Sequence, residues 1–183
     1  MSDEQGRPCV GDYVRARNDR IFHVGRLDAE TEGLLIMTND GELANRLGHP
    51  SHEIDKTYVA TVRGQVTTQD LRALREGVEL EDGFAKCDSA RLLQKLPEWS
   101  MVEIVIHEGR NRIVRRMMAE IGCPVTDLVR TRIGPVHLGQ QRIQYPNTIA
   151  VGDQFVRKVC ANKAGSPCYQ YFLAHGLVSL CAQ

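Results

Sequence analysis

Short apolar stretches along the chain have spacings that predict both strands and helices. Alternating or continuous apolar positions predict strands at Leu34–Thr38, Lys56–Val62, Met101–Ile106 and Val129–Ile133. Helical spacing together with capping residues predicts helices at Glu42–Leu47, Thr67–Arg75 and Arg112–Ile121. Because these elements do not follow a regular strand–helix alternation, we expect an α+β fold.

The predicted helix Arg112–Ile121 is amphipathic and rich in arginine. Its apolar residues at positions 113, 114, 117, 118 and 121 form one stripe. Arg112 and Arg116 lie on the opposite face, and Arg115 lies at the boundary, from where it could reach into a cleft. In the strand that follows, alternation places Arg130 and Arg132 on one face.

Composition adds that the chain is an ordinary globular protein. It has 183 residues, 42% of them hydrophobic and 25% charged, which favours a single folded domain over disorder. No apolar run approaches the roughly 18 residues of a membrane span, and the first residues do not form a signal peptide. We therefore expect a cytoplasmic protein with no membrane partner.

Charge and cysteines narrow the candidate chemistry. Lys+Arg and Asp+Glu balance at 23 each, yet six arginines lie between Arg110 and Arg132. Such a basic strip on a protein of zero net charge creates a positive electrostatic potential over one local site. It does not make the whole surface positive, as binding along a long polyanion would require. The six cysteines include no C-x-x-C pair, so we expect no metal site and reduced thiols.

Residues 24–41 carry the most specific motif, V-G-R-L-D-A-E-T-E-G-L-L-I-M-T-N-D-G. Further motifs follow in order: K-T-Y at 56–58, L-E-D-G at 80–83, H-E-G-R-N-R-I-V-R-R-M at 107–117 and R-I-G-P-V-H-L-G at 132–139. Together they resemble the RsuA/RluB-type pseudouridine synthases, and the resemblance covers roughly residues 3 to 139.

The resemblance implies the pseudouridine synthase catalytic fold, with a mixed, largely antiparallel sheet and flanking helices. It also implies an activity, the isomerisation of a specific uridine to pseudouridine in ribosomal RNA, without metal or organic cofactor. The RNA would be 23S or a pre-ribosomal particle, since residues 28–35 look more like the large-subunit enzymes. We expect the protein to act as a monomer.

Three residues match catalytic positions of the family. Asp28 matches the catalytic aspartate, and its role on the ring, the sugar or the 2′ proton stays open. Tyr58 resembles the tyrosine that stacks on the flipped base. Arg115 matches the active-site arginine, which would pair with the aspartate and lower its pKa. The alternatives are a capping aspartate, a half-buried strand tyrosine and a surface arginine.

Five further residues are candidate substrate contacts. By resemblance, Arg26 would occupy the space that the flipped nucleotide leaves, and Leu27 would shape the pocket wall or simply pack in the core. Arg110, Arg112 and Arg116 are candidate phosphate contacts that would make RNA binding depend on salt.

Both ends of the chain depart from the family pattern. The small N-terminal S4-type domain and the N-K-P-x-G motif are absent, so we expect residues 1–139 to form a catalytic domain that is incomplete at its N-terminus. Residues 140–183 hold three of the six cysteines and a single acidic residue. We expect this segment to be an atypical tail, either frameshifted or disordered.

Two other functions are kept as alternatives. One is a catalytically inactive, truncated fragment with residual RNA binding, because a missing first strand would leave the sheet open. The other is a non-specific RNA-binding module in which Asp28 is only structural. The zero net charge disfavours strong binding of RNA by this chain alone.

Overall fold

The computed structural model describes residues 21–138, 173–174 and 177–181, and its centre is a mixed sheet. In the described residues this sheet has nine strands, seven of them in the order β10-β11-β2-β8-β3-β7-β6, while β1 pairs with β2 and β9 with β8. All pairings are antiparallel except that between β2 and β8. The expected mixed, largely antiparallel sheet of an α+β protein is therefore confirmed.

The four strands that the sequence predicts are longer in the structure. They are β2 (Thr31–Thr38), β3 (Lys56–Arg63), β7 (Trp99–Ile106) and β8 (Val125–Ile133). Several strands were not predicted: β1 (Phe22–Val24), β4 (Val78–Leu80), β5 (Gly83–Ala85), β6 (Ser89–Lys95) and β9 (Val136–His137). Most of these strands are too short or too polar to show a periodic pattern of apolar residues. They form strands because they pair with a neighbouring strand.

All three predicted helices are present, and capping side chains mark the starts of two of them. Helix α2 (Gly41–Gly48) begins after Asp40, whose side chain accepts hydrogen bonds from two backbone amides of the first turn. Helix α3 (Thr68–Glu76) begins with a reciprocal capping box between Thr67 and Asp70. Helix α4 (Ile113–Glu120) follows Arg112, which adopts a left-handed conformation. The short 3-10 helix η1 (Pro50–His52) was not predicted.

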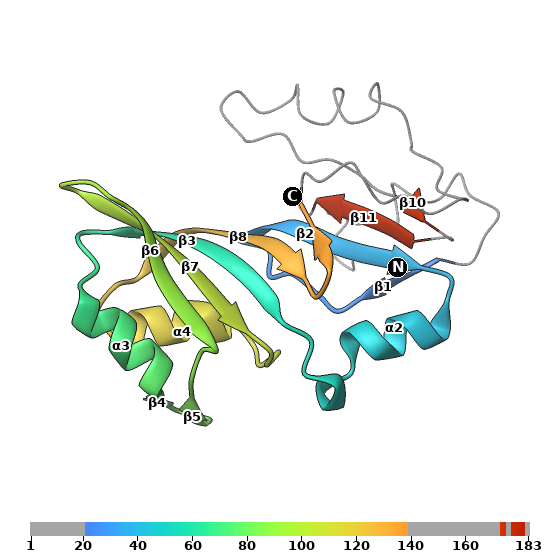
Figure 1. Ribbon diagram of the computed structural model, residues 1–183, viewed down its shortest axis with the longest axis horizontal. Helices are drawn as coiled ribbons and strands as arrows, with labels where there is room; N and C mark the ends of the chain where they lie inside the picture. The colour runs from blue at the N-terminus through green and yellow to red at the C-terminus, as the bar shows by residue number, and fades with distance from the viewer. Residues whose placement is uncertain (1–20, 139–172, 175–176, 182–183) are drawn as a thin grey trace.

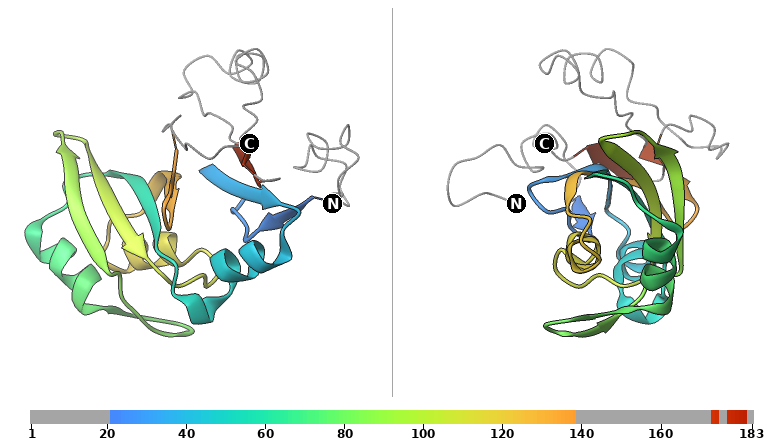
Figure 2. Two further views of the ribbon diagram at one scale, coloured as in Figure 1. Left: turned by 45° about the vertical axis from the view of Figure 1, so that its right-hand side comes forward. Right: turned by 90° about the vertical axis from the view of Figure 1, so that its left-hand side faces the viewer.

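The helices lie on one side of the sheet, in two groups (Figures 1 and 2). Helix α3 packs near β6, helix α4 packs near β4 and β8, and α2 packs near β1 and β2. Each group covers its own apolar cluster. The larger cluster has nineteen buried residues, including Val62, Ile104 and Met118. The smaller one has five: Val24, Leu34, Ile36, Leu47 and Ile133.

Two short strands represent the C-terminal segment among the described residues. They are β10 (Leu173–Ala174) and β11 (Leu177–Cys181), and β11 pairs antiparallel with residues 34–37 of β2. Residues 1–20 and most of 140–183 lie outside the described residues, so the expected catalytic-domain boundaries and the atypical tail stay predictions. In the described part of the chain, no helix is long and apolar enough to cross a membrane.

Candidate active site

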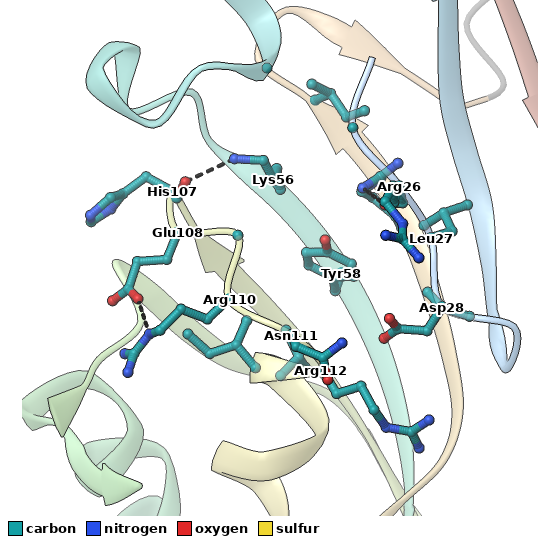
Figure 3. A pocket seen from close by; sticks show the side chains of 18 of the residues that line it. Arg26, Leu27, Asp28, Lys56, Tyr58, His107, Glu108, Arg110, Asn111 and Arg112 are labelled. Atoms are coloured by element: carbon teal, nitrogen blue, oxygen red, sulfur yellow. Dashed lines mark hydrogen bonds and ion pairs between the residues drawn. The ribbon is translucent and has the colours of Figure 1, made fainter. Parts of the chain in front are cut away.

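A cavity of about 720 Å³ lies between the two helix groups. The loop between β1 and β2, the end of α2, strands β3 and β8, and the segment 107–114 contribute its walls. Figure 3 shows side chains from these separate segments pointing into a common space. The cavity lies where the larger and the smaller apolar clusters meet, so residues far apart in the chain converge on it.

Asp28 occupies the loop between β1 and β2 at the wall of this cavity. A backbone hydrogen bond of 2.9 Å from the Thr31 amide to the Asp28 carbonyl closes a tight turn there. In Figure 3 the Asp28 carboxylate points into the cavity, toward the segment that carries Asn111. Arg26 and Leu27 line the same wall, with Arg26 exposed and Leu27 half-buried. The structure thus brings these three predicted residues together.

Tyr58 and Lys56 reach the cavity from strand β3, two residues apart and therefore on one face. Tyr58 is half-buried and packs against the larger apolar cluster. The Lys56 ammonium donates to the backbone carbonyls of Ile54 and His107, at 2.9 and 2.8 Å. Burial, and to a smaller extent the positive charge of Arg130, lower the pKa of Lys56. Lys56 thus fastens the start of the 107–112 segment to β3.

Arg130 is a buried cation of the cavity that the predicted site did not include. Its side chain is 3% exposed and donates to the carbonyls of Leu34 and Arg26, at 2.8 and 3.0 Å. The remaining nitrogen, Nη2, is buried without a partner in the described residues. Arg130 and Asp28 line the same cavity, and a buried guanidinium at a cavity wall can stabilise negative charge there.

A β-bulge explains why alternation gave the wrong orientation for this strand. Thr57 pairs with Arg132 and Tyr58 pairs with Arg130, with a register shift between the two pairs. Paired residues of antiparallel strands share a face, and consecutive residues of β3 face opposite sides. Arg130 and Arg132 therefore lie on opposite faces, because the bulge adds Thr131 to strand β8. The bulge turns Arg130 toward Tyr58 and the cavity.

Arg115 does not form the expected ion pair with Asp28 in the described structure. One guanidinium nitrogen donates to the Val125 carbonyl at 3.1 Å, and the other donates to the Glu30 carbonyl at 2.6 Å. Arg115 is also absent from the cavity wall. Its position at the edge of the helix stripe was predicted correctly, but two backbone carbonyls lie closer than the carboxylate and take both of its terminal nitrogens.

Arg110 and Arg116 both bind the hairpin formed by β4 and β5. Arg116 makes two contacts with the Asp82 carboxylate, at 2.6 and 2.9 Å. Arg110 contacts Asp82, the carbonyls of Gly83 and Phe84, and Glu108. In Figure 3 its guanidinium points away from the cavity. The hydrogen bond from Arg116 holds the pKa of Asp82 below its ordinary value.

Arg112 lies at the cavity wall and forms an ion pair with Glu30 at 2.6 Å. This pair joins the turn that carries Asp28 to the start of α4, and the hydrogen bond from Arg112 lowers the pKa of Glu30. Arg112 has φ of 49°, a left-handed conformation that costs energy for a residue with a side chain. The three arginines expected at phosphates therefore each have a carboxylate partner in this chain.

The comparisons with known proteins agree with this fold and cavity. The family model described as RNA pseudouridylate synthase matches residues 6–120. The chain belongs to this family of RNA pseudouridylate synthases. A crystal structure of a pseudouridylate synthase has the same fold, with a TM-score of 0.57 and 34% identity, over 64% of this chain and 50% of that one.

Two curated relatives are similar to the chain over most of its length. An "uncharacterized RNA pseudouridine synthase" of Mycobacterium bovis is 55% identical over 145 residues, which cover 78% of this chain and 57% of the relative. The "ribosomal large subunit pseudouridine synthase B" of Bacillus subtilis is 44% identical over 154 residues, 80% of this chain and 63% of the relative. The chain thus spans somewhat more than half the length of these relatives.

Proposed function

We propose that this chain isomerises a specific uridine to pseudouridine in ribosomal RNA, and that the RNA is that of the large subunit. The observation that carries the proposal is the convergence of Asp28, Tyr58 and Arg130 on one cavity from three separate segments. The likeness to the Bacillus subtilis enzyme, named for the large ribosomal subunit, supports the choice of RNA.

The proposed reaction asks for groups that this cavity contains. The bond between N1 of uracil and C1′ of ribose breaks, the base rotates, and C5 bonds to C1′ while the C5 proton is lost and N1 gains one. We propose Asp28 as the catalytic carboxylate, acting on the ring, the sugar or the 2′ proton. Tyr58 offers the aromatic face that a flipped base needs. Leu27 forms apolar wall, and Arg26 fills the vacated place in the RNA.

We assign Arg130 rather than Arg115 as the cation that acts with Asp28, because Arg130 lines the same cavity as Asp28 whereas Arg115 does not, and its buried Nη2 has no partner among the described residues. A fixed cation in a site shielded from water stabilises a carboxylate without reorganising during the reaction. Arg112 faces the cavity and is the first candidate for a phosphate contact. Arg110 and Arg116 both bind the β4–β5 hairpin. They therefore contribute to RNA binding mainly through their positive electrostatic potential and not through direct phosphate contacts.

Release of tritium from C5 tests this proposal. Unmodified 23S ribosomal RNA labelled at C5 of its uridines should lose tritium with the parent chain and not with Asp28→Ala. The two proteins should unfold at similar temperatures, because Asp28 is half-buried and only its backbone carbonyl makes a hydrogen bond in the turn. Release by neither folded protein would instead favour the inactive fragment that retains RNA binding.

Tritium release and RNA affinity, measured together, test the alternative of a non-specific RNA-binding module. Asp28→Asn keeps the size of the side chain, and a synthase would lose tritium release while keeping its affinity for 23S RNA. If Asp28 were only structural in a non-specific binding module, neither protein would release tritium. We expect weak binding, with a dissociation constant above about 1 μM in ~150 mM salt, because few phosphate contacts are available.

A further inference from the structure

The turn that carries Asp28 has few contacts of its own. Ala29 and Glu30 are exposed, and within the turn the backbone hydrogen bond from Thr31 to Asp28 closes the loop. A short exposed loop of this kind is free to shift unless other elements fix it. The position of a catalytic carboxylate in this loop therefore depends on contacts from elsewhere in the fold.

Helix α4 provides these contacts through Arg115. The guanidinium donates to the Glu30 carbonyl at 2.6 Å and to the Val125 carbonyl at 3.1 Å. Its Nε is buried and has no partner among the described residues. The side chain thus joins three elements: the Asp28 turn, helix α4 and the first residue of β8. The flat, forked shape of guanidinium permits both contacts at once, whereas an ammonium is a single point.

We propose that Arg115 is a positioning residue that fixes Asp28 through the main-chain carbonyl of Glu30, two residues further along the turn. This role rests on the proposed function. A bond to a backbone carbonyl sets the path of the chain itself, and so sets where the Asp28 side chain begins. Misplacement of a reacting group by about 1 Å can cost on the order of a hundredfold in rate.

Arg115 and Arg112 both contact Glu30, but they bind different parts of it. Arg112 binds the Glu30 carboxylate rather than its backbone, and the pair is well exposed on both sides. A side-chain ion pair in water holds a backbone weakly because both side chains can rotate. The carbonyl contact of Arg115 is therefore the stronger constraint on the turn.

Steady-state tritium release by the full chain on labelled, unmodified 23S ribosomal RNA tests this role. The variants are Arg115→Lys and Arg115→Ala, and the matched control is Arg72→Lys. Arg72 is an exposed arginine of helix α3, paired with Glu76 and not among the residues that line the cavity. We expect kcat to fall by about a hundredfold for Arg115→Ala and about tenfold for Arg115→Lys, with KM changed by less than about threefold. Arg72→Lys should match the parent.

Added guanidinium compounds separate positioning from folding. Arg115→Ala leaves a space beside two carbonyls that ethylguanidinium, at millimolar concentration, can enter. We expect it to raise the kcat of Arg115→Ala at least about fivefold while leaving the parent and its unfolding temperature unchanged. Arg115→Lys decides the question if the alanine variant does not fold.

Two results would overturn the proposal. One is that both variants retain the parent kcat within about threefold. The other is that the loss of kcat follows the loss of folded protein and ethylguanidinium does not restore it. A parent chain that releases no tritium at all would instead defeat the proposed function, so failures of the two proposals are distinguishable.

Discussion

The two ends of the sheet differ in how firmly they are built. The end with β3, β6, β7, α3 and α4 encloses nineteen buried apolar residues, whereas the end with β1, β2 and α2 encloses five. Tyr58 and the 107–112 segment belong to the first end, and Asp28 belongs to the second. The cavity therefore depends on how accurately a weakly packed end is fastened to a strongly packed one.

Few contacts make this connection in the described structure. Strands β2 and β8 pair over three residues only, Thr31–Gly33 against Leu128–Arg130. Arg130 adds two hydrogen bonds from β8 to the carbonyls of Leu34 and Arg26. Arg115 and Arg112 reach Glu30 from α4. Variants at these contacts should impair the geometry of the cavity while the larger apolar cluster stays folded.

The largest effect is expected at Gly33, in the parallel pairing of β2 with β8. Gly33 has φ of 109°, and a Cβ there would lie 2.2 Å from the Arg130 carbonyl oxygen. Because a backbone atom cannot move aside cheaply, Gly33→Ala should lower the free energy of unfolding by about 3 kcal/mol or more. Denaturant unfolding monitored by circular dichroism measures this change.

Gly64→Ala is the matched control for Gly33→Ala. Gly64 also has a positive φ, of 85°, but nothing lies within 4 Å of its Cβ position. The cost should be limited to the backbone term of about 1–2 kcal/mol. Equal losses in the two variants would show that the close approach of the strands at Gly33 does not matter.

The comparison also explains what the sequence could and could not predict. Strong periodicity and capping residues defined β3, α2 and α3, because those signals are local. The motif at residues 24–41 identified the Asp28 turn for the same reason. The orientation of Arg130 depends on a bulge opposite Thr57, a property of strand pairing that no single segment encodes.

The partner of Arg115 was mispredicted for a related physical reason. The helix pattern gave its orientation correctly, yet the distance to Asp28 depends on how the β1–β2 loop folds back on α4. Backbone carbonyls carry no sequence signal, so their competition for the guanidinium could not be anticipated. The contacts of Lys56 could not be predicted from the sequence for the same reason, because its ammonium donates to the backbone carbonyls of Ile54 and His107.

Arg130→Met should have the second largest effect and should also test the bulge. It leaves the carbonyls of Leu34 and Arg26 without donors, at about 1–3 kcal/mol for each buried group left unsatisfied. Loss of this cation from the wall of the cavity should lower kcat by about a hundredfold or more. Both values follow from denaturant unfolding and from tritium release on 23S RNA.

Arg132→Met is the control on the same strand. Arg132 is exposed on the opposite face, and its guanidinium donates to the Gly134 carbonyl. This variant should change stability by less than about 0.5 kcal/mol and leave kcat near the parent value. Similar losses in both variants would mean that the two arginines share a face, as simple alternation implies.

The smallest effect is expected at Asp82, because this contact lies within the strongly packed end. The Arg116 guanidinium lowers the pKa of Asp82 below its ordinary value. A carboxyl whose pKa is lower in the folded protein than in the unfolded chain binds protons less readily when folded. Its contribution to stability is therefore fully present above the unfolded pKa near 4 and is lost as the pH falls through the folded value.

Asp82→Asn removes this contribution, so the urea midpoints of variant and parent should differ most at pH 7 and converge as the pH falls below about 4. Glu42→Gln in the exposed Glu42–Arg46 pair of α2 should change the midpoint little at pH 7. Equal urea midpoints for Asp82→Asn and the parent at pH 7 would show that the hairpin is held by the carbonyl contacts of Arg110 and not by the carboxylate. In that case the ion pair between Arg116 and Asp82 would contribute little to the stability of the hairpin, and the carbonyl contacts of Arg110 would be its main attachment to the 107–112 segment.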